Sequence, residues 1–478
     1  MKRTLALLLC VAVIIGGLCG CGTKNANGGE VPTLVWYTFE QSQSDLQLVL
    51  EEANKIIEPA IGAKLDLQII DPGAYTEKMK MKMASREEFD LCFVGYNNGY
   101  VEAVENGGIA PLTELIEEYA PEIYDNVDDT FLDDATIDGE IYAIPNVQVG
   151  FVQQASWVQK EILDASGLEF DEVNEMKDLE PLFEFVKANY PDVIPWQIGF
   201  GINMWTVPKY ETISADIVIS KDAEKPEALI IRDTPEYKDG LNTIREWYKK
   251  GYIRQDIATV QDDSMDLRNG KYAVFQANWK PGHEKNVETM YGRKYVPIKM
   301  SEPYMNAGFS RSTMIGVSET SKHKDKAIQL ISLMNSNKEL YNLICFGIEG
   351  KHYTINSEGK AVVNAEAGYN ISTSAWKYGN QFNAYVTDGM DDTVWEDTMN
   401  LNKEASKSPL IGFQFDSSAV LNEASQIGAI ITEYGVIHRG YQEPSEYFDN
   451  MEKRIKNAGE EVLLKEIQTQ IAEFTKKK

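Results

Sequence analysis

The sequence predicts an α/β protein with more than one domain, and three observations lead to this prediction. The 478 residues exceed what a single hydrophobic core usually serves, so two domains are the better expectation. In the first hundred residues, apolar strand-like runs alternate with stretches of helical period, as in a parallel sheet covered by helices. A second alternation of the same kind begins after the turn and extended run of residues 138–145.

The first part of the chain contains three predicted strands separated by two predicted helices. Strands are expected at 31–39, 65–69 and 89–95, where apolar residues alternate or form a continuous run. Helices are expected at 44–57, where apolar residues recur at helical spacing, and at 75–84, a methionine-rich segment. This order predicts a sheet with helices packed on its faces.

Aromatic and amide side chains lie at or just after the ends of the first and third predicted strands. Trp36 and Tyr37 belong to the first strand, and Tyr96 and Asn97 follow the third. In open α/β sheets, ligands bind beyond the carboxyl ends of the strands. We therefore expect these four residues to lie near one crevice.

The rest of the chain repeats the pattern with more helix. Residues 147–157 are expected to be extended and to lead into a helix that begins near Gln159. Further helices are predicted at 179–189, 234–251, 323–336, 419–434 and 444–476.

The first 21 residues have the pattern of a bacterial lipoprotein signal peptide. A short basic start precedes residues 5–18, an uncharged apolar run too short to span a bilayer comfortably. The run leads into Leu18-Cys19-Gly20-Cys21, which resembles a lipobox, so Cys21 is the predicted lipidation site; otherwise it is an ordinary cysteine near the signal end. Residues 22–30 are small and polar and predict a flexible tether. We expect a protein on the extracellular face of the cell membrane, attached only through this lipid.

Composition excludes some partners. A formal net charge of −28 repels phosphate backbones, so nucleic-acid binding is not expected. Beyond the signal region the chain keeps only Cys92 and Cys345, which lie in apolar runs. We expect two buried free thiols in place of a disulfide framework.

The sequence contains no recognisable catalytic, cofactor-binding or metal-binding motif. The four histidines include no pair at the spacing of a zinc-binding helix. A calcium-loop reading that starts at Asp134 places Pro145 where a bidentate glutamate is required. No glycine run matches a dinucleotide or phosphate loop, and no serine has the context of a nucleophile elbow. We therefore expect no enzyme, no cofactor and no metal.

The order of several motifs resembles the carbohydrate-type extracellular solute-binding proteins of ABC importers, specifically the lipoproteins of Gram-positive bacteria that carry an extra C-terminal domain. Besides the lipobox, the likeness rests on FDLCFVG before GGIAPLTELIEEYAPEIYD, DGEIYAIPN before WVQKEILDASGL, RNGKYAVFQANWKPG, SKHKDKAIQLISLMNSNKELYNLICFGIEGKHY, YGNQFNAY and SPLIGFQFD. The resemblance implies a monomeric receptor for an oligosaccharide that delivers its ligand to the transmembrane subunits of a permease.

The resemblance also implies a type II periplasmic-binding-protein-like fold, with two α/β lobes joined by a hinge that the chain crosses repeatedly. It places crossings near 145–146, 295–298 and 347–350. The first lobe is then residues 31–145 plus 298–346. The second is residues 146–297 plus 347–478, including a C-terminal helical extension.

Aromatic side chains are the main candidates for ligand contact, because sugar rings pack on aromatic faces while their hydroxyls take hydrogen bonds. Trp279, in the segment QANWKP, matches a position where the family stacks an aromatic residue on sugar. The other candidates are Trp36, Tyr37, Tyr96, Asn97, Trp205, Trp376 and Gln381. For each aromatic residue the alternative is core packing. Alternatives for the whole protein are a receptor for a peptide or small cation, or a surface glycosidase.

Overall fold

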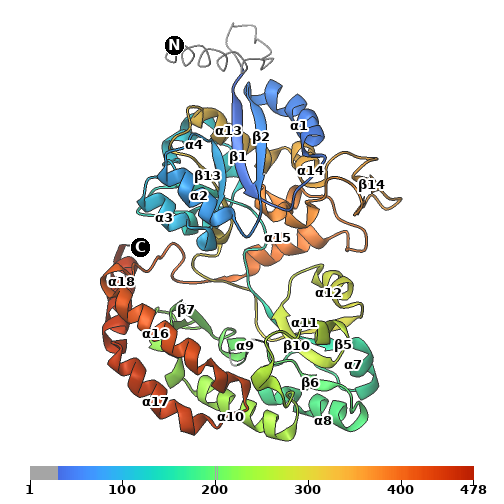
Figure 1. Ribbon diagram of the computed structural model, residues 1–478, viewed down its shortest axis with the longest axis vertical. Coiled ribbons are helices and arrows are strands. Elements are labelled where there is room, and N and C mark those ends of the chain that lie inside the picture. Colours follow the sequence, from blue (N-terminus) through green and yellow to red (C-terminus); the bar gives the residue numbers. More distant parts are fainter. Residues whose placement is uncertain (1–30, 200, 202, 478) are drawn as a thin grey trace, which may run out of the picture.

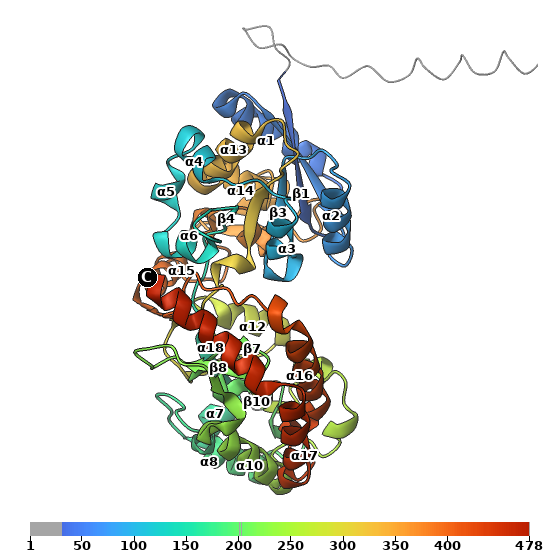
Figure 2. The ribbon, with the colours of Figure 1, turned by 90° about the vertical axis from the view of Figure 1, so that its left-hand side faces the viewer.

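The computed structural model describes residues 31–199, 201 and 203–477. They form two lobes stacked along the long axis of the molecule, with extended segments passing between them (Figure 1). The described chain begins at the end of the first lobe farthest from the second, as Figure 2 also shows. The predicted signal peptide, Cys21 and the tether lie outside the described residues. Among the residues described, no helix has the length and apolarity needed to cross a membrane.

A five-stranded sheet in the order β2-β1-β3-β13-β4 forms the centre of the first lobe. Strands β1, β2 and β3 are parallel, as the alternating pattern predicted, and β13 is antiparallel to both of its neighbours. Because β13 returns from later in the chain to lie between β3 and β4, it joins two distant parts of the sequence. The bounds are β1 (Thr33–Phe39), β2 (Lys64–Ile70), β3 (Leu91–Val94), β4 (Ala143–Pro145) and β13 (Met314–Val317).

Helix α1 illustrates how the helices of this lobe cover the sheet. Its apolar residues recur at helical spacing, so Val49, Ala53 and Ile57 lie on one buried face. Gly62 ends the helix in a left-handed conformation with a φ of 69°. The helices of this lobe are α1 (Leu46–Ile61), α2 (Tyr75–Ala84), α3 (Tyr100–Glu105), α4 (Thr113–Tyr119), α5 (Ile123–Asn126), α6 (Asp129–Ala135), α13 (Lys324–Ser336), α14 (Lys338–Phe346) and α15 (Val394–Glu404).

The second lobe contains a four-stranded sheet in the order β11-β5-β10-β6 and a smaller sheet of β7, β8 and β9. Strand β10 runs parallel to β6 and antiparallel to β5. The strands are β5 (Gln154–Gln159), β6 (Ile194–Trp196), β7 (Tyr210–Ser214), β8 (Ile217–Ser220), β9 (Leu229–Ile230), β10 (Tyr272–Asn278) and β11 (Tyr295–Lys299). The helices are α7 (Lys160–Ser166), α8 (Glu180–Asn189), α9 (Asn203–Thr206), α10 (Pro235–Lys250), α11 (Ser264–Arg268) and α12 (His283–Tyr291).

Three C-terminal helices complete the core of the second lobe. They are α16 (Leu421–Tyr434), α17 (Pro444–Asn457) and α18 (Glu460–Lys477). Ile427, Ile455 and Leu463, one from each helix, are fully buried in the same cluster as residues of α8 and α10. The single helix predicted at 444–476 is therefore wrong: Gly459, with a φ of 97°, ends one helix and lets the next fold back.

A buried ion triad fastens the start of α18 to the lobe. Arg232 pairs with Asp216 and with Glu460, and all three side chains are about 5% exposed or less. Arginine suits this position because its planar, always charged group offers several donors at once. The C-terminal helices are thus bound by both apolar packing and buried charge.

Three chain segments cross between the lobes side by side. Strands β12 (Tyr304–Met305) and β16 (Ser406–Lys407) pair in parallel, and Val152 exchanges two backbone hydrogen bonds with Tyr304, at 2.8 and 3.1 Å. A small apolar cluster of Phe151, Met305 and Ala405 fills the space between them. The two lobes are therefore connected by a packed, hydrogen-bonded hinge.

One buried carboxylate from each lobe holds the second crossing segment. Asp134 of α6 accepts hydrogen bonds from the backbone N–H groups of Gly308 and Ser310, at 2.7 and 2.9 Å. Glu211 of β7 accepts from the Ala307 N–H at 2.7 Å and from the Tyr304 hydroxyl at 3.1 Å. Burial raises the pKa of Glu211 in spite of these donors.

Two of the expected crossings are wrong in position. Residues 295–298 form part of β11 inside the second lobe, and the chain crosses after them. Residues 347–350 stay in the first lobe, because Gly347 and Gly350, both at a φ of 79°, turn the chain back on itself. The third crossing is the segment around β16.

The lobe boundary moves accordingly. Residues 347–404, which we expected in the second lobe, pack on the first. Tyr369 and Tyr378 are fully buried in the cluster that contains α1 and α14, and the Tyr369 hydroxyl donates to the carbonyl of Ile344 at 2.6 Å. This segment includes β14 (Tyr353–Ile355), β15 (Ala361–Val363) and α15.

The buried triad can be compared with an exposed ion pair of the same lobe. Replacing Arg232 with alanine leaves two buried carboxylates without a cation, so the free energy of unfolding of the second lobe should fall by about 3–5 kcal/mol. Urea denaturation followed by tryptophan fluorescence measures the change. Arg454→Ala, which removes an exposed pair with Glu433, is the control, and its loss of stability should be much smaller because water screens an exposed pair. Equal losses in the two variants would contradict this account.

Candidate functional site

The strand ends that carry candidate ligand residues face each other across the space between the two lobes. Strands β1 and β2 run from the far end of the first lobe toward the second (Figure 1). In the second lobe, β10 ends at Asn278 and leads through Trp279 into α12. At the start of α12, a Cβ added to Gly282 would lie 2.9 Å from Val394 of α15, so the two lobes are in close contact there.

A groove of about 580 Å³ lies between α12 of the second lobe and α15 of the first. We call it the interlobe groove. Its lining residues are Trp279, Pro281, Gly282, Glu284, Lys285, Glu288, Gly389, Met390, Asp391, Val394, Asp397, Asn400, Leu401 and Glu404. Because both lobes contribute walls, its width depends on the angle between them.

Trp279 is held in a defined orientation at one side of the groove. Its backbone N–H donates to the carbonyl of Gln153 at 2.7 Å, and its indole N–H donates to Glu284 at 2.6 Å. The ammonium of Lys299 lies 5.1 Å from the ring centroid, over the ring. The side chain remains half-buried, so part of the indole is open to the groove.

The first lobe contributes an aromatic cluster at the carboxyl ends of β1 and β3. The Phe39 and Phe93 rings are 5.1 Å apart, and Trp376 lies 6.4 and 6.0 Å from them. Lys377 is buried beside this cluster and pairs with Glu40. Burial lowers the pKa of Lys377, while Glu40 opposes the shift.

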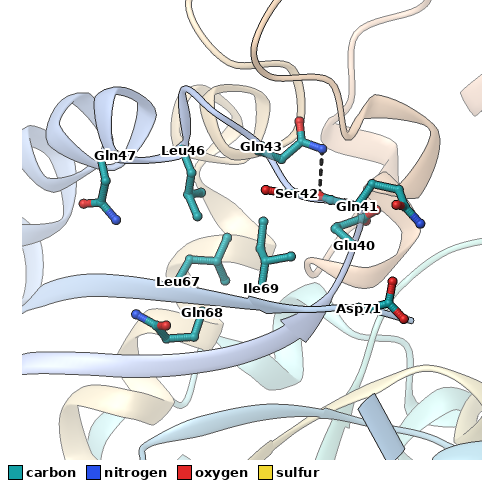
Figure 3. A pocket seen from close by; sticks show the side chains of 10 residues that line it. All are labelled: Glu40, Gln41, Ser42, Gln43, Leu46, Gln47, Leu67, Gln68, Ile69 and Asp71. Carbon is teal, nitrogen blue, oxygen red and sulfur yellow. Dashed lines mark hydrogen bonds between the residues drawn. The ribbon is translucent and has the colours of Figure 1, made fainter. Parts of the chain in front are cut away.

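A second hollow, of about 370 Å³, lies beside the ends of β1 and β2. Figure 3 shows Leu67 and Ile69 of β2 on one side and the loop before α1 opposite, where Gln43 donates to the carbonyl of Gln41. The lining residues are Glu40, Gln41, Ser42, Gln43, Leu46, Gln47, Leu67, Gln68, Ile69 and Asp71. Its amides and carboxylates can serve as donors and acceptors for a polar ligand.

Polar side chains lie beneath Trp279 at the start of β5. The amide of Gln154 donates to Asn278 at 2.7 Å, and that of Gln153 donates to the carbonyl of Ser301 at 2.8 Å. Both glutamines are more than 90% buried. They connect β5, β10 and the end of β11, and so fix the base of the loop that carries Trp279.

The structure distributes the remaining candidates differently. Trp36 is 1% exposed and packs edge-on against Tyr378, so it is a core residue. Trp205 is also buried and lines a separate hollow beside α10. Gln381 is half-buried and donates its N–H to the carbonyl of Val147 near the hinge.

Tyr96 and Asn97 lie at the end of the first-lobe sheet that faces the second lobe, whereas Tyr37 lies in the middle of β1. Tyr37 is half-buried, packs against Phe89 and has the ammonium of Lys82 above its ring. Tyr96 and Asn97 belong to a short 3-10 turn directly after β3. Asn97 is exposed, and the side chain of Tyr96 is not among those that the structure describes.

Sequence reasoning missed helix α15 as a wall of the interlobe groove. It also missed Phe39, Phe93 and Lys377, which pack with Trp376 in the first-lobe cluster and lie outside the lining of the groove. The position of Phe39 at the end of a strand was a usable signal. No local sequence pattern indicated that α15 belongs to the site, because its place beside α12 depends on the third crossing.

The two cysteines agree with the prediction. Cys92 and Cys345 are both free and buried. Burial raises the pKa of Cys92 to about 12 and also raises that of Cys345. In the part of the chain that the structure describes, no cluster of side chains is suited to hold a metal ion.

The strand order of the first lobe, the triple crossing and the interlobe groove define a two-lobed solute-binding protein with the type II fold. A model of the bacterial extracellular solute-binding protein family matches residues 60–344, more than half of the chain, so the chain belongs to this family. A model of a domain of unknown function, DUF3502, matches residues 409–476, which contain α16 and α17 and almost all of α18. These findings confirm the resemblance seen in the sequence.

Related proteins bind carbohydrates. A carbohydrate ABC transporter substrate-binding protein of Streptococcus pneumoniae is 29% identical, over 98% of this chain and 97% of its own length. The polygalacturonan/rhamnogalacturonan-binding protein YtcQ of Bacillus subtilis is 20% identical over 76% of each chain.

A solved structure is similar to this chain over most of its length. The N-glycan transport solute-binding protein NgtS of S. pneumoniae is 26% identical, with a TM-score of 0.82 over 93% of this chain and 99% of that one. For NgtS in complex with Man5GlcNAc, the TM-score is 0.67 over 94% and 99% of the two chains.

The raised thiol pKa values predict chemical inertness. At pH 8 the chain from Gly22 onward should not react with the disulfide reagent DTNB, because burial keeps Cys92 and Cys345 protonated and out of reach. After unfolding in guanidinium chloride both thiols should react, since their pKa values return to about 8.5. Absorbance of the released thiolate measures both states. Rapid reaction of the native protein would contradict the burial.

Proposed function

We propose that this chain is the substrate-binding component of an ABC importer, which captures an oligosaccharide in the interlobe groove and delivers it to the permease subunits. The observation that carries the proposal is the groove itself, which lies between two hinged lobes and has Trp279 held at its side. Indole faces pack on the apolar faces of sugar rings, while carboxylates and amides accept from sugar hydroxyls. The carbohydrate-binding relatives support this choice of ligand.

Ligand capture would proceed by closure of the lobes about the hinge. Helices α12 and α15 face each other across the groove, so a decrease in the angle between the lobes brings their side chains onto a ligand. The TM-score is 0.82 for NgtS and 0.67 for NgtS in complex with Man5GlcNAc, a decrease that a different angle between the lobes would produce. Binding and release require no covalent step, so we propose a receptor without enzymatic activity.

We further propose that the protein is a monomer anchored through a lipid on Cys21 at the extracellular face of the membrane. Small residues and an apolar run precede this cysteine, as processing requires. Attachment at this end suits the fold, because the described chain begins at the far end of the first lobe (Figure 2). The groove then lies away from the point of attachment.

Trp279 provides a direct test of the ligand site. Replacing it with alanine removes the proposed stacking surface, and the Kd for a bound oligosaccharide should rise by roughly tenfold or more. Isothermal titration calorimetry across a panel of oligosaccharides measures this. Tyr124→Ala, which removes an exposed aromatic side chain from α5, should leave the Kd unchanged.

The same calorimetry separates the alternative functions. Saturable binding of a glycan without turnover supports a receptor, whereas release of products from a labelled oligosaccharide would indicate a glycosidase. Heat from peptides or cations, with none from any glycan, would overturn the choice of ligand. An unchanged Kd for Trp279→Ala would remove Trp279 from the site.

Lipidation can be tested separately in a bacterial host. Cys21→Ala, or treatment with the signal-peptidase inhibitor globomycin, should prevent formation of the mature lipoprotein and alter its mass. The Cys21→Ala protein should also leave the membrane fraction, because no acyl chain would hold it there. Mass spectrometry and cell fractionation measure these effects. A membrane-bound Cys21→Ala protein of unchanged processed mass would contradict the assignment.

A further inference from the structure

The interlobe groove is strongly acidic. Its lining contains five carboxylates and one lysine, and the carboxylates come from both lobes: Glu284 and Glu288 from α12, Asp397 and Glu404 from α15, and Asp391 from the preceding loop. Lys285 is the one cation in the lining. A ligand inside the groove would therefore have negative charge on two opposing walls.

These carboxylates are not neutralised by nearby cations. In the described chain, none of the five forms an ion pair within 4.0 Å. Glu284 accepts from the Trp279 indole at 2.6 Å, and Asp397 accepts from the Thr393 hydroxyl at 2.7 Å. Lys299, over the Trp279 ring, reduces the negative charge locally but leaves an excess of carboxylates.

The excess of carboxylates is larger in the groove than in other hollows: the hollow beside α10 has four carboxylates and two lysines, and the hollow beside α18 has three and two. The hollow at the end of α10 is lined by Lys187, Arg254 and Lys271 with two aspartates, so its formal charge is positive. The first-lobe hollow of Figure 3 has two carboxylates, Glu40, which is paired with Lys377, and Asp71. The five carboxylates of the groove are thus the largest group among these hollows.

Charge of this kind discriminates between glycans. A hydroxyl donates readily to a carboxylate, and such charge-assisted bonds are stronger than neutral ones. A uronate or sialate carboxylate would instead face like charges in a closing space where water and counterions are reduced, and so be repelled. The groove thus favours ligands that donate hydrogen bonds and carry no negative charge.

We propose that the interlobe groove selects uncharged glycans and excludes acidic ones, with Glu288 and Glu404 among the residues that determine this specificity. The inference rests on the proposed function, since it concerns the ligand of the same groove. It goes further by naming the class of carbohydrate and the side chains that reject the other class. It would separate this chain from a receptor for polyuronates.

The test compares two ligands that differ at a single carbon, where a carboxylate replaces a hydroxymethyl group, and the salt dependence isolates the effect of the charge. Man5GlcNAc is one probe, and the other is the same glycan with the C6 hydroxymethyl group of a terminal mannose oxidised to a carboxylate. Calorimetry on the mature protein should give at least roughly tenfold weaker binding of the oxidised glycan at about 10 mM salt. The difference should shrink at about 1 M salt, where the Debye length falls to roughly 3 Å.

Matched variants assign the effect to the groove. In Glu288→Gln/Glu404→Gln, the difference between the two glycans should decrease several-fold, because two like charges are removed while hydrogen-bonding groups remain. Glu51→Gln/Glu184→Gln has the same net charge, and both of its positions are exposed and outside the lining, on α1 and α8 at the two ends of the molecule (Figure 1). In this control the difference should stay at its original value.

Each outcome decides one claim. Equal or tighter binding of the oxidised glycan overturns the specificity and leaves the oligosaccharide receptor standing. A difference that responds neither to salt nor to the groove variant also overturns it, as does a control that behaves like the groove variant. Failure of every uncharged oligosaccharide in the panel to bind overturns the proposed function, and the specificity with it.

Discussion

The segment from Tyr304 to Ser310 is held by buried carboxylates from both lobes, and the placement of each lobe depends on it. Asp134 approaches from the first lobe and Glu211 from the second, and both accept from backbone N–H groups of this one crossing. A carboxylate removed from water is tolerated only where donors replace its hydration. Ala307 is therefore bound to the second lobe and Gly308 to the first. Changes in the angle between the lobes must be absorbed by the backbone around these two residues.

Packing at the hinge also determines which side chains line the groove. Helix α15 ends where Asn402 accepts from the Gly150 N–H at 2.8 Å and donates to the carbonyl of Gln148 at 2.8 Å. These bonds join the third crossing to the first and set α15 opposite α12. The acidic face of α15 and the indole of Trp279 then meet across a space whose width the hinge controls. The contacts that form the hinge therefore also set the positions of the groove walls.

Most first-lobe elements were predictable because their patterns are local. The alternating burial of β1 and β2, and the continuous burial of β3, follow directly from residues 31–39, 65–69 and 89–95. The site was less predictable. Trp36 lies in the middle of β1 and is buried in the core, whereas Trp279 follows the end of β10 and is half-buried beside the groove. Since neighbouring strand residues point to opposite faces, an error of one position exchanges core for cleft.

The sequence alone determined the α/β class, the family, the buried free thiols and the strongly negative charge, because each follows from composition, local period or motif order. Tertiary structure decided the return of residues 347–404 to the first lobe, the position of the hinge crossings and the meeting of α12 with α15. These depend on contacts between segments far apart in the chain, such as Gly150 with Asn402 and Asp134 with Gly308. Such contacts produce no periodic pattern in the sequence, because each involves single residues whose partners depend on the packing of the whole molecule.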